Sequence, residues 1–234
     1  TLRAAQDELV QAAKLAVLGQ LAAGITHELA QPLGAMRTLS GNAIEFMKRG
    51  NLATVEQNLG IIARLADQMG RIITPLKTFA RKSPAIPTPT DVAHAVGAAL
   101  FLLDQRLTKA GISVLNHCEP GQAIALCDQN RLEQVLINLI RNAGDAMSDS
   151  PRKELLIEAA PAADGHLTLS IADSGCGLPA DGALFEPFFT TKPAGEGLGL
   201  GLAISRDIVR EFGGDLHAEN RPEGGARFIL NLPA

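Results

Sequence analysis

Aromatic residues are scarce in this chain, which has no Trp, no Tyr and only 8 Phe among 234 residues. Proteins that hold single strands of nucleic acid without reading their sequence stack bases on aromatic rings, and the chain is poorly supplied for such a surface. Positive charge is not in excess either, because 21 Lys and Arg are outnumbered by 25 Asp and Glu. Both shortages argue against a nucleic-acid partner.

Cysteines and long apolar runs are also few. The 3 cysteines, Cys118, Cys127 and Cys176, show no C-x-x-C spacing, which indicates a reducing environment and no structural metal site. No apolar run approaches the roughly 18 residues of a membrane-spanning helix, and no signal peptide is visible. The sequence begins inside a helical pattern. We therefore expect it to be a fragment of a longer protein.

The first third of the chain predicts two helices. Residues 1–48 form one pattern, and a helix of that length, about 70 Å, is not stable alone in water. A second helix is expected from Leu52 to Phe79, with apolar residues in a seven-residue repeat. Each helix has one narrow apolar seam, and two helices cannot enclose a core. We expect a second copy to complete a four-helix bundle, giving a homodimer. The alternative is a hairpin that packs on its own second domain.

His27 lies in the most informative part of the first helix. Apolar residues recur there with alternating spacings of three and four, at Leu18, Leu21 or Ala22, Ile25, Leu29, Pro32 or Leu33, Met36 and Leu39. His27 falls about 200° from Ile25 and Leu29, on the opposite face. An exposed imidazole beside Glu28 is a candidate nucleophile with an orienting base. An ordinary solvated histidine is the alternative for this stretch taken alone.

The second part of the chain begins after a proline-rich stretch. Residues 83–90 are expected to form a linker, with residues 1–82 as one domain and residues 91–234 as another. Helices are predicted at 92–107, 129–147 and 200–212, with Asp91 and Asp128 as N-caps of the first two. Short strands are predicted at 112–115, 123–126, 155–159, 167–172, 216–218 and 227–232. Helices that alternate with a mixed sheet predict a two-layer α/β sandwich.

Two amides stand in an otherwise apolar helix, at Asn138 and Asn142. They lie one turn apart and share a face, and unpaired amides in a core are unfavourable. A polar ligand beside them is therefore expected, and amide oxygens suit Mg²⁺ that is shared with nucleotide phosphates. A buried pair of Asn residues bonded to the backbone is the alternative.

Two glycine-containing stretches follow. In ADSGCGLP, Asp173 can accept a hydrogen bond from an adenine amino group, and Gly175 and Gly177 permit a tight turn beside a flat ligand. In the second, glycines precede or open a helix whose free N–H groups can bind phosphate, and Lys192 adds a positive charge. The residues assigned to the nucleotide in this second stretch are Lys192, Gly197, Leu198, Gly199, Leu200 and Gly201. A flexible Gly-rich loop is the alternative.

These motifs, in this order, resemble those of sensor histidine kinases. HELAQP resembles the H-box, LINLIRNAGDAM the N-box, ADSGCG the G1 box, and FEPFFTTKPAGEGLGLGLAI the F and G2 boxes. The resemblance implies the histidine kinase and gyrase-type ATPase fold, ATP and Mg²⁺ as cofactors, and Asn142 as the likelier Mg²⁺ ligand with Asn138 close to the phosphates. QP after the H-box and the following RTLSGNA look like the branch that contains C4-dicarboxylate transport sensors and oxygen-sensing nitrogen-fixation kinases.

The resemblance further implies autophosphorylation of His27 and phosphoryl transfer to an Asp of a response-regulator receiver domain. It also implies that this chain is the cytoplasmic portion of a protein anchored in the inner membrane, whose sensor and membrane segments are absent here. Gyrase-type ATPases carry a Glu base where Asn138 stands, so this chain lacks their water-activating group. Gln31 occupies a position where many families have Thr or Asn, and its amide could orient a water for dephosphorylation of the regulator. Two other functions compete with this interpretation: a gyrase-like ATPase, and a dimeric scaffold that binds nucleotide without turnover.

Overall fold

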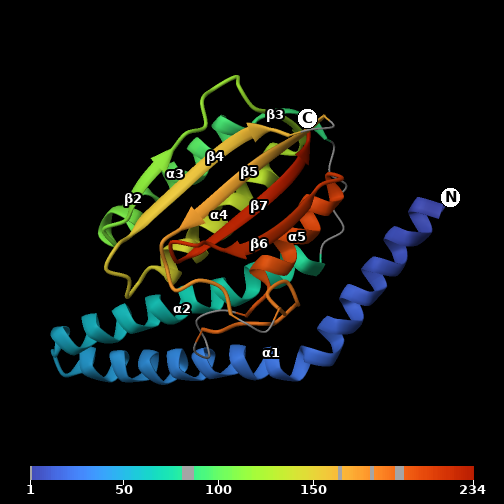
Figure 1. Cartoon of the computed structure of the whole chain (residues 1–234). Helices are drawn as coiled ribbons and strands as arrows, with labels where there is room; N and C mark the ends of the chain where they lie inside the picture. The colour runs from blue at the N-terminus through green and yellow to red at the C-terminus, as the bar shows by residue number, and fades with distance from the viewer. Residues whose placement is uncertain (1, 81–86, 163–164, 180–181, 193–197) are drawn as a thin grey trace. The chain divides into compact units, whose positions relative to one another are not determined.

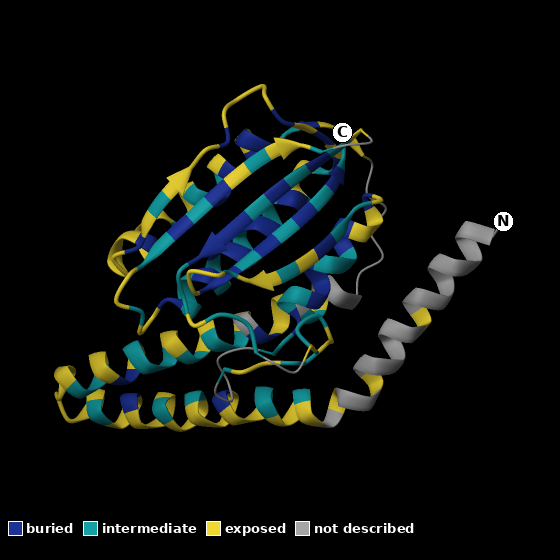
Figure 2. Cartoon of the chain, in the orientation of Figure 1, coloured by how far each residue is buried: buried dark blue, intermediate teal, exposed yellow. Residues whose placement is uncertain are grey.

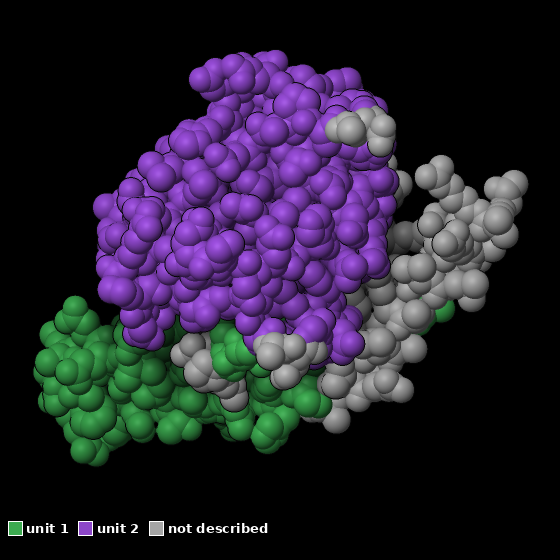
Figure 3. All heavy atoms as spheres, viewed as in Figure 1, with its two compact units in different colours: residues 1–82, 190–200 green, residues 83–189, 201–234 purple. Residues whose placement is uncertain are grey.

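A computed structural model describes residues 2–80, 87–162, 165–179, 182–192 and 198–234. The chain divides into two compact units (Figure 3). The first comprises residues 1–82 with 190–200, and the second comprises residues 83–189 with 201–234. In the described residues, no helix combines the length and the apolar character needed to cross a bilayer.

The first unit contains two long helices that pack along each other, α1 (Leu2–Lys48) and α2 (Leu52–Ala80) (Figure 1). The hairpin turn uses Gly50 at φ 73°, and Asn51 Oδ1 accepts the Thr54 N–H at 3.2 Å to begin α2. Lys48 stands in the last turn of α1, where a cation favours the helix dipole. The predicted helix limits are confirmed to within one residue at each described end.

From Ile25 onward the apolar stripe of α1 lies where the spacing predicted it, whereas the predicted side chains of Leu18 and Leu21 lie outside those that the structure describes. Pro32 and Ala43 are buried, and Ile25, Leu29 and Met36 are partly buried. Between the two alternatives left by the sequence, Pro32 belongs to this stripe, because Leu33 is 58% exposed. The helix remains continuous through Pro32. On α2, Leu59 and Ile73, two apolar residues of the predicted seven-residue repeat, are 55% and 45% exposed.

The second unit contains a five-stranded sheet in the order β2-β4-β5-β7-β6 (Figure 1). Its strands are β2 (Ser113–Asn116), β4 (Glu154–Pro161), β5 (His166–Asp173), β6 (Asp215–Asn220) and β7 (Ala226–Pro233). The β2–β4 pair is parallel and the other three pairs are antiparallel, which confirms the predicted mixed sheet. Alternate residues of β7 are buried, as expected for a sheet covered on one face (Figure 2).

Three helices accompany this sheet: α3 (Val92–Lys109), α4 (Gln129–Ala146) and α5 (Gly201–Glu211). The central helix α4 packs between α3 and α5 and against β4 and β5. Asp91 and Asp128 cap α3 and α4 as predicted, because their carboxylates accept the N–H groups of Ala93 and Arg131 at 3.0 Å. The core is formed by apolar side chains that are almost fully buried, among them Leu132, Leu136, Leu139, Ile157, Leu169, Ile171 and Leu216.

One strand was not anticipated from the sequence. Thr88–Asp91 forms β1, which pairs antiparallel with β3 (Ile124–Cys127) in a separate two-stranded sheet. The end of the stretch expected to be a linker is therefore ordered, whereas its beginning, 83–86, lies outside the described residues. Pro89 is compatible with a strand here because the sheet has only two strands, so each strand has an unpaired edge.

Candidate phosphoacceptor and nucleotide sites

His27 is exposed on α1, and Glu28 is partly buried. Gln31 follows one turn later on the same face, and its Nε2 lies 3.0 Å from His27 Nε2. Within the described part of the chain, no hydrogen bond joins Glu28 to His27. Neighbouring residues on a helix point about 100° apart, so Glu28 would need a side-chain rearrangement to act on this ring.

The first element of the candidate nucleotide site is Asp173, at the end of β5. Its side chain is 1% exposed, and its Oδ1 accepts the N–H of Gly175 at 2.8 Å and that of Ala226 at 3.3 Å. Burial raises the pKa of this carboxyl above its ordinary value, while these two hydrogen bonds and the charge of Arg221 act in the opposite direction. Both backbone donors use the same oxygen, which leaves Oδ2 for a ligand.

Glycines at 175, 177 and 225 shape the backbone around Asp173. Cys176, between the first two, donates its N–H to the Ala146 carbonyl at the end of α4, at 3.1 Å. Gly225 lies so close to this strand that an added Cβ would be 2.1 Å from the Asp173 carbonyl oxygen. Arg221, which sequence reasoning missed, donates to the same carbonyl at 2.8 Å. These contacts join the end of β5 to α4 and to the β6–β7 turn.

The second element is Asn138 of α4, which is held on both sides. Its Nδ2 donates to Ser205 Oγ at 3.0 Å, and its Oδ1 accepts from Arg141 Nη2 at 3.1 Å. Gly201, the first residue of α5, has no room for a side chain, because an added Cβ would be 2.4 Å from Asn138 Oδ1. The amide is thus fixed at the N-terminus of α5, where free backbone N–H groups favour phosphate. Neither Arg141 nor Ser205 was singled out from the sequence.

The donor atoms fit a hydrated divalent cation shared with a nucleotide. Asn138 has a partner at each end of its amide. Asn142, one turn later, is partly exposed. An amide oxygen at Asn142 suits Mg²⁺, which usually binds few protein groups together with water and phosphate. The described residues hold no cluster of three or more His, Cys, Asp or Glu residues that could bind a metal ion.

The remaining predicted nucleotide-binding residues lie elsewhere in the chain. Lys192 and Leu198–Leu200 belong to the segment that groups with the first unit, and Gly197 is outside the described residues. Their approach to Asn138 and Asp173 stays a prediction. The structure therefore brings together Asn138, Gly201 and Ser205 at one point, and Asp173, Gly175 and the β6–β7 turn at another.

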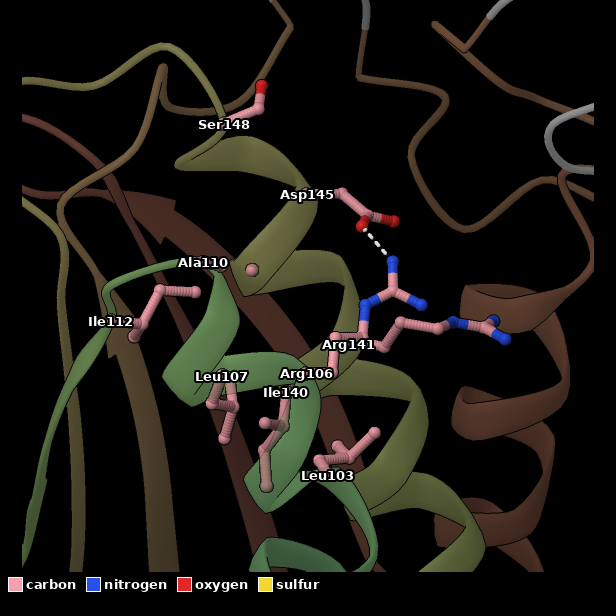
Figure 4. Close-up of a pocket in the computed structure, with 10 residues that line it drawn as sticks. Leu103, Arg106, Leu107, Ala110, Ile112, Ile140, Arg141, Asp145 and Ser148 are labelled. Carbon is pink, nitrogen blue, oxygen red and sulfur yellow. Dashed lines mark hydrogen bonds and ion pairs between the residues drawn. The ribbon is translucent and has the colours of Figure 1, made fainter.

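A cavity of about 200 Å³ opens between the C-terminal halves of α3 and α4 (Figure 4). Leu103, Leu107, Ile112 and Ile140 form its apolar wall, and Arg106 Nη2 pairs with Asp145 Oδ1 at 2.6 Å at its edge. Asp145 lies on the same helix as the amide pair. The ion pair therefore connects α3 to the end of α4 that carries Asn142.

The three cysteines differ sharply in environment. Cys118 and Cys127 are buried, and Cys176 is exposed. Burial, followed by the charges of Glu158 and Asp91, raises the pKa of the Cys118 thiol to about 11. Burial also raises the pKa of Cys127. No contact in the described residues activates Cys176 as a nucleophile.

Two family models match the chain. Residues 17–84 match the His Kinase A (phospho-acceptor) domain, and residues 127–234 match the histidine kinase-, DNA gyrase B-, and HSP90-like ATPase family. His27 lies within the first match, and Asn138, Asp173 and Gly201 lie within the second. The two matches fall on different halves of the chain, in the order expected from the motifs.

Curated relatives match over nearly the whole chain. The C4-dicarboxylate transport sensor protein DctB of Rhizobium meliloti is 42% identical over 99% of this chain and 37% of its own length. The sensor protein FixL of Bradyrhizobium diazoefficiens is 34% identical over 100% of this chain and 47% of its own length. The chain thus spans less than half of these relatives.

Solved structures agree with the fold. The catalytic domain of histidine kinase ThkA is 30% identical, with a TM-score of 0.53 over 62% of this chain and 96% of that domain. A structure of ThkA in complex with the response regulator protein TrrA gives a TM-score of 0.70 over 97% of this chain and 65% of that chain, at 24% identity. The second likeness concerns the fold alone.

Proposed function

Because this chain belongs to the sensor histidine kinase family, we propose that it transfers the γ-phosphoryl group of ATP to His27 and then to an Asp of a response-regulator receiver domain. The observation that carries the proposal is the exposed imidazole of His27, which lies inside the match to a phosphoacceptor domain, in a chain that also matches the histidine kinase- and gyrase-type ATPase family. The motifs and the similarity to DctB both favour the C4-dicarboxylate sensor branch.

The second unit supplies the nucleotide site. Asp173 Oδ2 would accept the adenine amino group, since Oδ1 is already engaged by backbone donors. Asn138, fixed by Arg141 and Ser205, would face the phosphates beside the N-terminus of α5. Asn142 would hold Mg²⁺, which neutralises phosphate charge when bound. Lys192 and residues 197–201, on the glycine-rich stretch expected to bind phosphate, complete the proposed set of nucleotide-binding residues.

The first unit supplies the acceptor. Nε2 stands at the tip of the imidazole ring, away from the main chain, so it is the nitrogen that an external phosphate can approach. In the proposed reaction its lone pair forms the bond to phosphorus, and the bond between that phosphorus and the bridging oxygen breaks to release ADP. The ring then gives up its Nδ1 proton, and Glu28 is the adjacent carboxylate that can take it.

We assign residues 1–82 to dimerisation and phosphotransfer, residues 83–90 to the connection, and residues 91–234 to ATP binding. The exposed apolar residues of the hairpin support a homodimer, because a second hairpin would cover them in a four-helix bundle. Since the chain spans less than half of its relatives, we also propose that the parent protein has sensor and membrane-anchoring segments and that this portion is cytoplasmic.

Labelling with γ-labelled ATP and Mg²⁺ tests the proposal. A phosphohistidine is stable in base and labile in acid, so the label should survive base, disappear in acid and be absent from His27→Ala. The His27→Ala protein should still bind nucleotide. Steady phosphate release without a protein label would instead identify a gyrase-like ATPase, and tight nucleotide binding with neither outcome would identify a scaffold.

Dephosphorylation of the regulator is a second candidate activity, favoured by the amide of Gln31 beside His27. Such an amide can hold a water for attack on an aspartyl phosphate that docks against the ring. The Gln31→Ala variant should then remove phosphate from the regulator more slowly. An unchanged rate of dephosphorylation would count against this activity.

A further inference from the structure

Gln31 makes the only hydrogen bond found for the His27 ring in the described residues. Its amide nitrogen lies 3.0 Å from ring Nε2, a usual hydrogen-bond length. The other residues that share this face, at positions three or four away, are Ala23, Gly24 and Ala30, which have no polar side-chain atoms. Among the residues three or four positions from His27, Gln31 is thus the one whose side chain can form a hydrogen bond with this ring.

The chemistry of the two nitrogens fixes the direction of this bond. An amide nitrogen can only donate, so ring Nε2 must accept. A neutral imidazole that accepts at Nε2 carries its proton on Nδ1. The contact therefore holds His27 in the tautomer whose lone pair is on the outer nitrogen. An amide rotated by half a turn would present its oxygen and would require the opposite tautomer, so the two arrangements are distinguishable by experiment.

We infer that Gln31 caps the phosphoaccepting nitrogen of His27 and restrains its phosphorylation. This inference rests on the proposed function, in which the Nε2 lone pair attacks the γ-phosphorus of ATP. The lone pair cannot accept the Gln31 hydrogen bond and attack phosphorus at the same time. An interaction that is made in the resting state and lost in the transition state lowers the rate. Gln31 therefore has two opposite effects on phosphorylation. It selects the His27 tautomer that can react, and its hydrogen bond lowers the rate at which that tautomer attacks phosphorus.

The same amide gains a new partner after the transfer. When the bond from Nε2 to phosphorus forms and ADP leaves, Nε2 no longer has a lone pair to accept a hydrogen bond. The Nδ1 proton passes to Glu28 or to water, so the product ring is neutral and the charge lies on the phosphoryl oxygens. The Gln31 N–H groups can then donate to these oxygens, which are stronger acceptors than a ring nitrogen. The hydrogen bonds of the Gln31 amide thus stabilise the phosphorylated product more than the transition state of phosphorylation.

A tautomer measurement tests the cap without any phosphorylation. Nitrogen-15 NMR of His27 in the whole chain, about two pH units above the ordinary imidazole pKa, should show the proton on Nδ1. In Gln31→Ala, the Nδ1–H and Nε2–H tautomers of His27 should both be populated. In Gln31→Glu, which has the same length but can only accept, the proton should move to Nε2. Gln57→Ala, an exposed position on α2, is the matched control and should leave the His27 signals unchanged.

The rate of autophosphorylation tests the restraint. An exposed hydrogen bond of ordinary strength corresponds to roughly a two- to fivefold effect, so Gln31→Ala should incorporate label about that much faster, while Gln31→Glu and Gln57→Ala should show no gain. An Nε2–H tautomer in the unmodified chain, or a Gln31→Ala rate that is equal to or below that of the unmodified chain, overturns the inference. If the label instead persists in His27→Ala, the proposed function fails, whatever the tautomer.

Discussion

The two units differ in how far they bury their apolar side chains. The first is the hairpin of α1 and α2, and the second is the sandwich of the five-stranded sheet with α3, α4 and α5. The sandwich encloses its own core, and Leu136, Leu139, Leu155 and Ile171 are fully buried. None of the described residues of α1 and α2 is among the largest fully buried side chains. The hairpin instead exposes Leu33, Ile44, Met47, Leu52, Leu59 and Ile73 by 45% or more. One unit encloses its core within a single chain, whereas the exposed side chains of the other would be covered only by a second apolar surface.

A groove on the hairpin shows the same difference in the burial of apolar side chains. Ser40, Ala43, Ile44, Met47, Val55 and Leu59 line a hollow between α1 and α2. Only Ser40 among them is polar. A hollow of this composition near the hairpin turn is what a four-helix bundle would fill with side chains of a second copy. The sandwich has no such requirement, so its stability should not depend on protein concentration.

The largest effect is expected from Gly225→Ala, which should destabilise the sandwich and spare the hairpin. The residue has φ +88°, and an added Cβ would be 2.1 Å from the Asp173 carbonyl oxygen. We expect a loss of roughly 3–5 kcal/mol in the free energy of unfolding of the sandwich, because neither backbone can move cheaply. Calorimetry should show one transition lowered and the other unchanged.

Gly224→Ala is the matched control for this change. Its φ is +93°, but nothing lies within 4 Å of an added Cβ. Only the backbone strain applies, and we expect a loss of about 1–2 kcal/mol. Equal losses for the two variants would show that the close approach to Asp173 does not matter. If the hairpin and the sandwich unfolded together in a single calorimetric transition, the contrast between a self-contained sandwich and a separate hairpin would be wrong.

The next effect concerns Asp173→Asn, which should weaken ATP binding and stabilise the empty sandwich. The Asn oxygen would accept the backbone donors of Gly175 and Ala226, so its NH₂ group would meet the adenine amino group, a donor against a donor. We expect about a tenfold to hundredfold loss of ATP affinity, measured by titration calorimetry.

The stability of this variant has a defined pH dependence. Burial raises the pKa of the Asp173 carboxyl, so the folded state favours the protonated form. Its contribution to stability is fully present below the ordinary Asp pKa and is lost as pH rises through the raised value. The stability gained by Asp173→Asn should therefore appear at neutral pH and vanish in acid. A gain that persists in acid would point to a different cause.

A smaller effect is expected from Leu59→Ala on the hairpin. Leu59 is 55% exposed in the single chain and would be covered in the proposed dimer. We expect the dimer to lose about 1–2 kcal/mol, so that its dissociation constant rises roughly fivefold to thirtyfold in analytical ultracentrifugation. Phe101→Ala on α3 is the control, since Phe101 is 83% exposed and belongs to the self-contained unit. Comparable shifts in the two variants would contradict the contrast between the units.

The smallest effect is expected from Arg106→Gln at the cavity between α3 and α4. The Arg106 and Asp145 side chains are 57% and 29% exposed, so solvent and salt screen their attraction. We expect the sandwich to lose about 0.2–1 kcal/mol, with the loss disappearing at high salt. A larger loss, measured by urea denaturation and insensitive to salt, would mean that the pair fixes the end of α4.

Much of the fold could be predicted because its signals are local. The caps at Asp91 and Asp128 and the three- and four-residue spacing in α1 each depend on a few neighbouring residues. β1 was missed because three prolines in ten residues are typical of a linker, and its pairing with β3 is formed across more than thirty intervening residues.

The candidate site was likewise predictable only where its signals are local in the sequence. The types and order of His27, Asn138, Asp173 and Gly201 suggested a nucleotide and an acceptor, and their roles are predictions that the experiments above address. The partners of these residues could not be read from the sequence. Ser205 lies 67 residues from the Asn138 that it contacts, and Arg221 lies 48 residues from Asp173. Such contacts depend on how β-strands and helices pack, which no local pattern encodes.

The unequal exposure of the cysteines makes the chain convenient for site-selective chemistry. Cys118 and Cys127 are buried, with pKa values raised, so few thiolates are available there at neutral pH. A maleimide dye should therefore attach to Cys176 without mutagenesis. Because Cys176 lies between Gly175 and Gly177, beside Asp173, the brightness of such a fluorophore would report nucleotide occupancy in real time.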